Sequence, residues 1–143
     1  MNYEQARAYA VNVSRSGSIL GLDSIENLMH ELGDIQERLK IIHIAGTNGK
    51  GSTGAYLERV LIEAGYRVGR YSSPAVFDPM EVWRINLQSM SHEEYADIME
   101  QVKCACDRMV EKGMEHPTIF EVETAMASVS YTHLRAHETR SNL

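Results

Sequence analysis

The fold of this chain is decided by the stretch Ile41-Ile42-His43-Ile44-Ala45-Gly46-Thr47-Asn48-Gly49-Lys50-Gly51-Ser52. Residues 41–45 form a short apolar run, which predicts a strand buried on both faces of a parallel sheet. A glycine-rich loop, residues 46–52, follows, and a helix is predicted after it by the apolar residues Tyr56, Leu57, Val60, Leu61 and Ala64. Gly65 ends that helix, and residues 67–71 predict a second strand. This order predicts a right-handed crossover between parallel strands, so we expect an α/β fold with a mainly parallel sheet.

A strand that enters a glycine-rich turn at the start of a helix is typical of polyphosphate sites. Glycine lets the backbone approach the phosphates, and the amides at the helix N-terminus direct positive partial charge toward them. Lys50 is predicted to reach the β- and γ-phosphates, and the Ser52 hydroxyl to help hold phosphate or Mg²⁺. The common phosphate-loop pattern differs, since it has glycine in place of Ile44 and a hydroxyl residue in place of Gly51. A tight turn with a surface lysine is the alternative.

Other elements are predicted on both sides of this unit. Three helices begin with a capping pair, in which a small polar residue precedes Glu or Gln by three positions: Asn2 and Gln5, Asp23 and Glu26, Ser91 and Glu94. The first covers residues 3–14, the second ends at Gly33 and the third at Gly113, and a fourth begins near Phe120 and runs through Ala127. The apolar face of the third is predicted to consist of Tyr95, Ile98, Met99, Val102, Cys106, Met109 and Val110. A short strand is expected near residues 84–87, within an otherwise irregular segment.

Composition limits the class of protein. The 143 residues are 43% hydrophobic, enough for the core of one domain, and the net charge of −6 without a basic stripe argues against a nucleic-acid partner. The sequence contains no apolar run of about 18 residues that would predict a membrane span, and no secretory signal is visible at its start. Cys104 and Cys106 fall on roughly opposite sides of a predicted helix, which favours reduced thiols and a cytoplasmic protein.

The glycine loop and its surroundings resemble a known family. Residues 42–52, followed by Val60-Leu61 and Gly65, resemble the first signature of folylpolyglutamate synthase/dihydrofolate synthase, within the Mur ligase superfamily. Other Mur ligases usually place two hydroxyl residues after the lysine, so Gly51 favours the folate branch.

Two further motifs extend the resemblance. Tyr71-Ser72-Ser73-Pro74 is similar to the family's (T/S)SP loop, which implies that Ser73 is a magnesium ligand. Phe120-Glu121 resembles an FE pair near the pterin pocket. Ser73 as an ordinary turn serine and Phe120 as a core aromatic are the alternatives. The chain departs from the family pattern at Ala75, where histidine is usual, and at Trp83, where glutamate is usual.

The resemblance implies a truncated Mur-ligase-type ATPase domain over residues 1–127. With ATP and Mg²⁺, the full-length enzyme is expected to add L-glutamate to folate or dihydropteroate through an acyl phosphate, as a monomer. Lys50 is the expected catalytic residue, Ser73 the metal ligand, Phe120 and Glu121 the substrate contacts, and the nucleotide-binding residues are Gly46, Thr47, Asn48, Gly49, Lys50, Gly51 and Ser52. A peptide ligase of cell-wall synthesis and a nucleotide-binding module without ligase chemistry remain alternatives.

The last residues differ in character from the rest. Residues 128–143, SVSYTHLRAHETRSNL, are polar and show no apolar helix face, so a disordered, non-native tail is predicted. The family would continue here with a second signature that supplies another magnesium ligand. We therefore expect the 143-residue chain to be inactive by itself.

Overall fold

The computed structural model describes residues 1–17 and 21–141, with side chains described as far as residue 133. The chain divides into two compact units. The first, the helical unit, consists of Met1–Leu39 and His92–Leu143, and the second, the loop unit, consists of Lys40–Ser91. Each unit is considered separately below.

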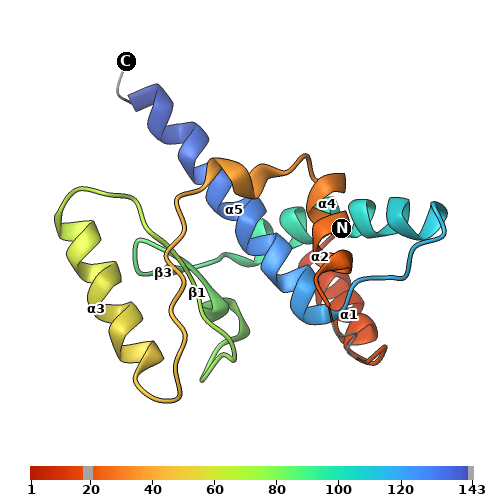
Figure 1. Cartoon of the computed structure of the whole chain (residues 1–143), viewed down its shortest axis with the longest axis horizontal. Helices are drawn as coiled ribbons and strands as arrows, with labels where there is room; N and C mark the ends of the chain where they lie inside the picture. Colours follow the sequence, from red (N-terminus) through yellow and green to blue (C-terminus); the bar gives the residue numbers. More distant parts are fainter. Residues whose placement is uncertain (18–20, 142–143) are drawn as a thin grey trace. The chain divides into compact units, whose positions relative to one another are not determined.

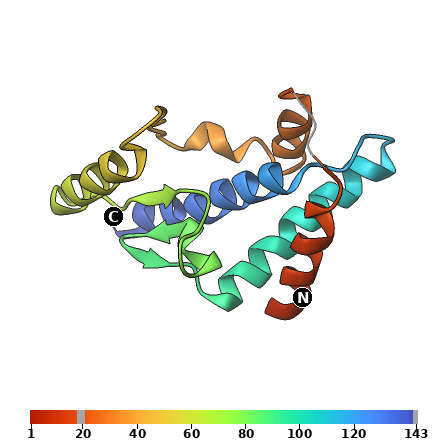
Figure 2. The ribbon, with the colours of Figure 1, turned by 90° about the horizontal axis from the view of Figure 1, so that it is seen from below.

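The helical unit contains the α-helices α1 (Tyr3–Ser14), α2 (Asp23–Glu31), α4 (His92–Glu111) and α5 (Ile119–Ser141), and the 3₁₀-helix η1 (Ile35–Arg38). α1, α2 and α5 all pack against α4, and η1 packs against α5 (Figure 1). Figure 2 shows α1 lying alongside α4. The core between these helices includes Ala6, Ala10, Val13, Leu28, Met29, Tyr95, Met99, Val102, Met109, Val122 and Met126.

The predicted helix ends agree well with this unit. Asn2 and Gln5 form the predicted capping box of α1, and Gly33 and Gly113 follow their helices with φ of 85° and 83°. Asp23 is not the cap of α2, because Leu22 occupies that position and makes no side-chain cap bond. The apolar face predicted for α4 is buried except at Val110, which is 49% exposed.

α5 overturns the prediction that the chain loses its structure after Ala127. The helix continues to Ser141, and Val129 and Ser130 are buried. Polar residues fit this helix because their hydroxyls bond to carbonyls one turn earlier: Ser128 donates to Thr124, and Thr132 donates to Ser128. Residues 142–143, which the predicted tail also included, lie outside the described residues, as do the side chains beyond 133.

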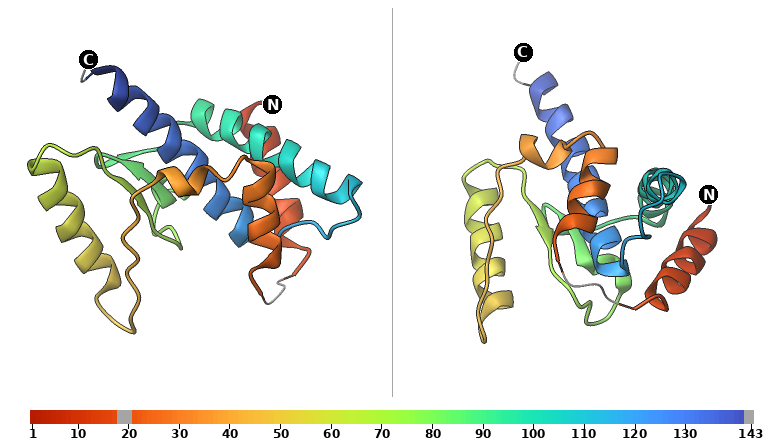
Figure 3. Two further views of the ribbon diagram at one scale, coloured as in Figure 1. Left: turned by 45° about the horizontal axis from the view of Figure 1, so that its top comes forward. Right: turned by 45° about the vertical axis from the view of Figure 1, so that its right-hand side comes forward.

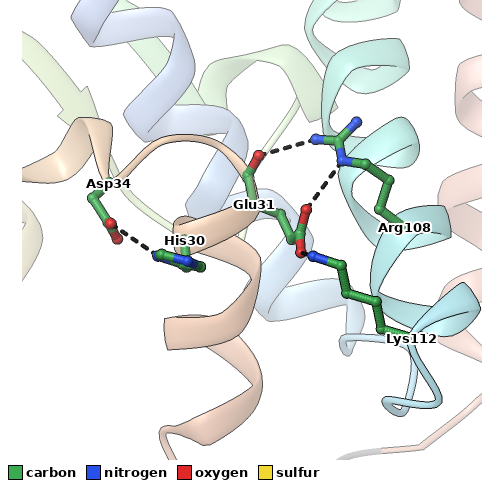
Figure 4. A network of polar contacts seen from close by, with 5 residues as sticks. All are labelled: His30, Glu31, Asp34, Arg108 and Lys112. Carbon is green, nitrogen blue, oxygen red and sulfur yellow. Dashed lines mark hydrogen bonds and ion pairs between the residues drawn. The ribbon is translucent and has the colours of Figure 1, made fainter.

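A cluster of charges joins α2 to α4 (Figure 4). Arg108 donates from Nε to Glu31 Oε2 at 3.1 Å and from Nη2 to the Glu31 carbonyl at 2.9 Å, and the Lys112 ammonium donates to Glu31 Oε1. The hydrogen bonds from Lys112 and Arg108 hold the pKa of the Glu31 carboxyl below its usual value. Beside them, His30 Nδ1 lies 3.1 Å from Asp34 Oδ2.

The loop unit contains α3 (Lys50–Glu63), the 3₁₀-helix η2 (Pro79–Val82) and three short strands. The strands are β1 (Gly69–Tyr71), β2 (Trp83–Ile85) and β3 (Gln88–Ser89), and they are hydrogen-bonded in the order β1-β2-β3. Figure 3 shows them as short green arrows. Tyr71 pairs with Trp83, and Ile85 with Gln88. Asn86 and Leu87 form the turn between β2 and β3, both with positive φ (46° and 71°).

This sheet differs from the predicted one in two ways. Both strand pairs are antiparallel, so the parallel crossover from residues 41–45 to residues 67–71 is not formed. The predicted strand 41–45 has no regular structure, and Ile41 and Ile42 are 68% and 63% exposed. A strand must exchange backbone hydrogen bonds with a neighbour, and no described segment of the sheet pairs with residues 41–45. β1 pairs instead with β2, which lies close to it in the sequence.

None of the described helices is both long and apolar enough to cross a membrane. The two cysteines differ as expected from their spacing on α4, since Cys104 is exposed and Cys106 is buried. Burial raises the pKa of the Cys106 thiol to about 11.

Candidate phosphate-binding site

The glycine loop lies where the sequence predicts it, at the N-terminus of α3. Gly49 occupies the N-cap position with a φ of 78°, a conformation that favours glycine. The first intrahelical bond runs from the Thr53 amide to the Gly49 carbonyl at 2.9 Å. The amides of Lys50, Gly51 and Ser52 precede that bond and have no acceptor within the helix. They form the kind of positive helix end that binds anions.

The loop leaves room for a ligand. A Cβ built at Gly49 or Gly51 would meet no atom within 4 Å. At Gly46 the nearest atom would be the Asn48 carbonyl oxygen, at 3.8 Å. Residues 46–52 are all exposed, so a phosphate can reach the loop amides without displacing a packed side chain.

Lys50 extends back along the loop. Its ammonium group donates a hydrogen bond to the carbonyl of Gly46, at the other end of the glycine-rich segment. The positive charge therefore lies on the loop itself and not in a distant ion pair. Lys50 is exposed, which keeps its ammonium accessible to a charged ligand.

Arg70 and Glu58 also lie beside this loop, and neither was predicted from the sequence. Arg70, in β1, donates from Nη2 to the Gly51 carbonyl at 3.0 Å and from Nη1 to Glu58 Oε2 at 3.1 Å. Glu58 is only 2% exposed. The sequence offered one clue to this contact, because Gly51, Gly54 and Glu58 fall on one face of the predicted helix. If that face is buried, the carboxylate of Glu58 needs a cation beside it.

Ser73, the predicted metal ligand, lies in the loop unit just after β1, and its side chain is exposed. The neighbouring backbone is fixed, because the Ser72 amide donates to the Val82 carbonyl at 3.1 Å. Ser73 and Ser52 carry hydroxyl oxygens, a donor type that suits Mg²⁺, which commonly completes its shell with water and substrate phosphates. Within the described residues there is no group of three or more His, Cys, Asp or Glu side chains that could hold a metal ion by themselves.

Phe120 and Glu121, the predicted substrate contacts, lie in the helical unit. Glu121 is buried and forms a capping box with Thr118 at the start of α5, since its Oε2 accepts from the Thr118 amide at 2.8 Å while Thr118 Oγ1 accepts from the Glu121 amide at 3.4 Å. Phe120 is 62% exposed, so its side chain is not part of the core of the helical unit. Glu121 also borders a cavity of about 310 Å³ that is lined by Gly21, Asp23, Ser24, Asn27, Met109, Met114 and Glu115.

Comparison with known proteins identifies what this arrangement resembles. No protein-family model matches the sequence. The chain is 35% identical, over 125 residues, to the dihydrofolate synthase/folylpolyglutamate synthase of Bacillus subtilis (strain 168). The aligned residues make up 87% of this chain and 29% of that protein. The chain thus spans less than a third of the length of that relative.

Solved structures agree with the sequence match. A folylpolyglutamate synthase in complex with AMPPCP and folate is 29% identical with a TM-score of 0.82, over 96% of this chain and 33% of that one. A bifunctional folylpolyglutamate synthase/dihydrofolate synthase with Mn, AMPPNP and L-glutamate bound is 32% identical with a TM-score of 0.77, over 89% of this chain and 30% of that one. These neighbours support an α/β fold. The family resemblance predicted from the sequence is therefore confirmed: over most of its length, this chain is homologous to a part of the folylpolyglutamate/dihydrofolate synthases.

Proposed function

We propose that this chain supplies the phosphate-binding part of an ATP-dependent ligase that joins L-glutamate to folate or dihydropteroate. The observation that carries the proposal is the start of α3, where three amides, the left-handed Gly49 and the Lys50 ammonium meet at one accessible loop. The ligands of the two solved relatives, which include ATP analogues, folate and L-glutamate, support the choice of substrates. The names of the similar proteins favour a folate enzyme over a cell-wall peptide ligase.

The proposed reaction consists of two transfers. A carboxylate oxygen of the folate substrate attacks the γ-phosphorus of ATP, the bond to ADP breaks, and an acyl phosphate forms. The amine nitrogen of glutamate then attacks the acyl carbon, loses a proton, and phosphate leaves as the amide bond forms. Such transfers depend mainly on positioning and on neutralising charge at the phosphates.

Each residue of the loop has a part in this scheme. Lys50 exchanges its bond to the Gly46 carbonyl for oxygens of the β- and γ-phosphates, and the amides of Lys50, Gly51 and Ser52 bind phosphate at the helix end. Ser52 and Ser73 are the proposed hydroxyl ligands of Mg²⁺. When bound, Mg²⁺ supplies positive charge to the phosphate oxygens. Phe120, with its exposed ring, is proposed to stack on the pterin, next to the capping residue Glu121.

We further propose that residues 1–127 are part of a larger ATP-binding domain and that residues 128–143 are not native to it. The chain then has no ligase activity by itself, because ligation also needs an adenine pocket, a glutamate site and further metal ligands. Its two free cysteines support a cytoplasmic protein, and we expect the complete enzyme to be a monomer.

The decisive test is Lys50→Ala in the complete enzyme, assayed by transfer of radiolabelled glutamate to tetrahydrofolate. Charge-assisted hydrogen bonds contribute about 1.5–3 kcal/mol each, so losing two of them should reduce turnover by about 100-fold or more. Arg59→Ala is the matched control, because it removes a cation from the exposed Arg59–Glu63 pair on the same helix, and it should keep normal activity. Normal rates in Lys50→Ala would contradict the phosphate-loop assignment.

A further inference from the structure

Arg70 joins the phosphate loop to the sheet in the loop unit. Its two terminal nitrogens reach different partners on α3, the Gly51 carbonyl at 3.0 Å and Glu58 Oε2 at 3.1 Å. Its guanidinium also lies against Gly54, where a Cβ would come within 3.4 Å of Nε and 3.6 Å of Cζ. Three positions on one face of α3 therefore hold one side chain of β1.

The bond from Arg70 to the Gly51 carbonyl also affects the amide of the same peptide unit, which belongs to Ser52. A peptide unit is planar and trans, so the Gly51 carbonyl and the Ser52 amide point in opposite directions from one rigid plane. When Arg70 holds the carbonyl, the Ser52 amide is directed out of the N-terminus of α3, where a phosphate would bind. Arg70 therefore sets the direction of one of the three loop amides without touching the ligand.

Glu58 sets the position of Arg70 in turn. Its carboxylate is 2% exposed, while the Arg70 side chain is 18% exposed. Oε2 binds Arg70, and Oε1 has no hydrogen-bond partner among the described residues. A buried carboxylate needs a cation, so Glu58 keeps the guanidinium beside α3. Lysine could neutralise Glu58, but a single ammonium cannot reproduce the planar fork that spans both partners.

We propose that Arg70 is a positioning residue that orients the first turn of α3 for binding the phosphates of ATP, through the Gly51 carbonyl and with Glu58 as its anchor. The proposal rests on the proposed function, since it assigns Arg70 a role in the site that Lys50 is expected to complete.

The test uses the 143-residue chain and four variants: Arg70→Leu, Arg70→Lys, Arg67→Leu and Lys50→Ala. Arg67→Leu is the matched control, because Arg67 is exposed and the substitution makes the same change in charge three residues earlier. Titration with Mg-ATP should give a dissociation constant about tenfold higher in both Arg70 variants, equivalent to about 1.4 kcal/mol. Arg67→Leu should bind as the parent chain does.

Arg70→Lys separates positioning from a purely structural role. It should melt at nearly the same temperature as the parent chain, because Glu58 keeps a cation, but still bind ATP weakly. Amide exchange provides a readout that needs no ligand: at Thr53, Gly54 and Ala55 it should be at least about fivefold faster in Arg70→Lys than in Arg67→Leu.

Three results would overturn the proposal. If both Arg70 variants bind ATP like the parent chain while Lys50→Ala does not, Arg70 has no positioning role and the phosphate loop stands. If Lys50→Ala also binds normally, the loop assignment fails and the role of Arg70 fails with it. Where ATP binding to the chain is too weak to measure, unchanged amide exchange in Arg70→Lys would overturn the proposal.

Discussion

The two units of this chain obtain their structure in different ways. In the helical unit, the backbone hydrogen bonds of each helix form within that helix. Apolar side chains from α1, α2, α4 and α5 fill a shared core. In the loop unit, three short strands provide only a few backbone bonds, and apolar residues such as Ile41, Ile42, Tyr56 and Val60 are exposed. A helix needs only the chain within one turn of itself, while a strand needs a neighbour that can come from anywhere in the protein.

The largest effect expected from this difference is in amide exchange. Amides in the middle of α4 should exchange at least about 100-fold more slowly than those of residues 41–45, because local opening follows the density of buried contacts and backbone bonds. Hydrogen–deuterium exchange read by NMR would measure both segments in one sample. Equal protection would show that the amides of residues 41–45 are hydrogen-bonded in solution, as the predicted strand requires.

A second experiment compares two single substitutions. Met99 in α4 is fully buried, and Ile42 is 63% exposed. Met99→Ala should lower the free energy of unfolding by about 2–5 kcal/mol, because it removes buried apolar contacts and leaves a cavity. Ile42→Ala should change it by less than about 0.5 kcal/mol, as is usual for exposed positions. Urea unfolding followed by the helical circular dichroism signal gives both values, and a similar loss in both variants would mean that Ile42 is buried in solution.

The smallest expected effect concerns the charges that join α2 to α4. Since the pKa of Glu31 is lowered in the folded chain, its contribution to stability is complete above its usual pKa of 4.5. That contribution is lost as the pH falls below 4.5 and through the lower folded-state value. Glu31→Gln should therefore melt a few degrees below the parent chain at pH 7 and show a smaller difference at pH 3.

Glu111→Gln is the control for that measurement, because it neutralises an exposed carboxylate of α4 that is in no described ion pair. The melting temperature of Glu111→Gln should stay close to that of the parent chain at both pH 7 and pH 3. A difference between Glu31→Gln and the parent chain that does not depend on pH would contradict the role assigned to the charge of Glu31.

The difference between helices, which depend on nearby residues, and strands, which need a partner elsewhere, explains how far the sequence could predict the fold. The start of α1, the glycines that end α2 and α4, and the loop before α3 were all predictable, because each depends on residues within a few positions. The parallel sheet was not, because the partners of a strand are not encoded next to it. α5 was predicted too short, because its serine and threonine residues were taken as evidence against a helix. Their hydroxyls instead bond to carbonyls of the same helix.

The site shows the same limit. Gly49 and Lys50 could be assigned because the loop pattern is local, and both lie at the start of α3. Arg70 and Glu58 could not, because their contact depends on which face of α3 meets β1. Glu121 was predicted to contact substrate, and its side chain takes part in the capping of α5, so its contact with substrate remains a prediction.

The turn between β2 and β3 has a consequence for protein engineering. Asn86 tolerates its left-handed backbone, and its side chain accepts a hydrogen bond from the Val68 amide at 2.8 Å. Leu87 has a φ of 71°, which costs a branched residue about 1–2 kcal/mol. Asn-Gly is the pair that two-residue hairpin turns favour most. The hairpin therefore carries a removable strain, and glycine at position 87 offers a simple way to stabilise the loop unit without altering the phosphate loop.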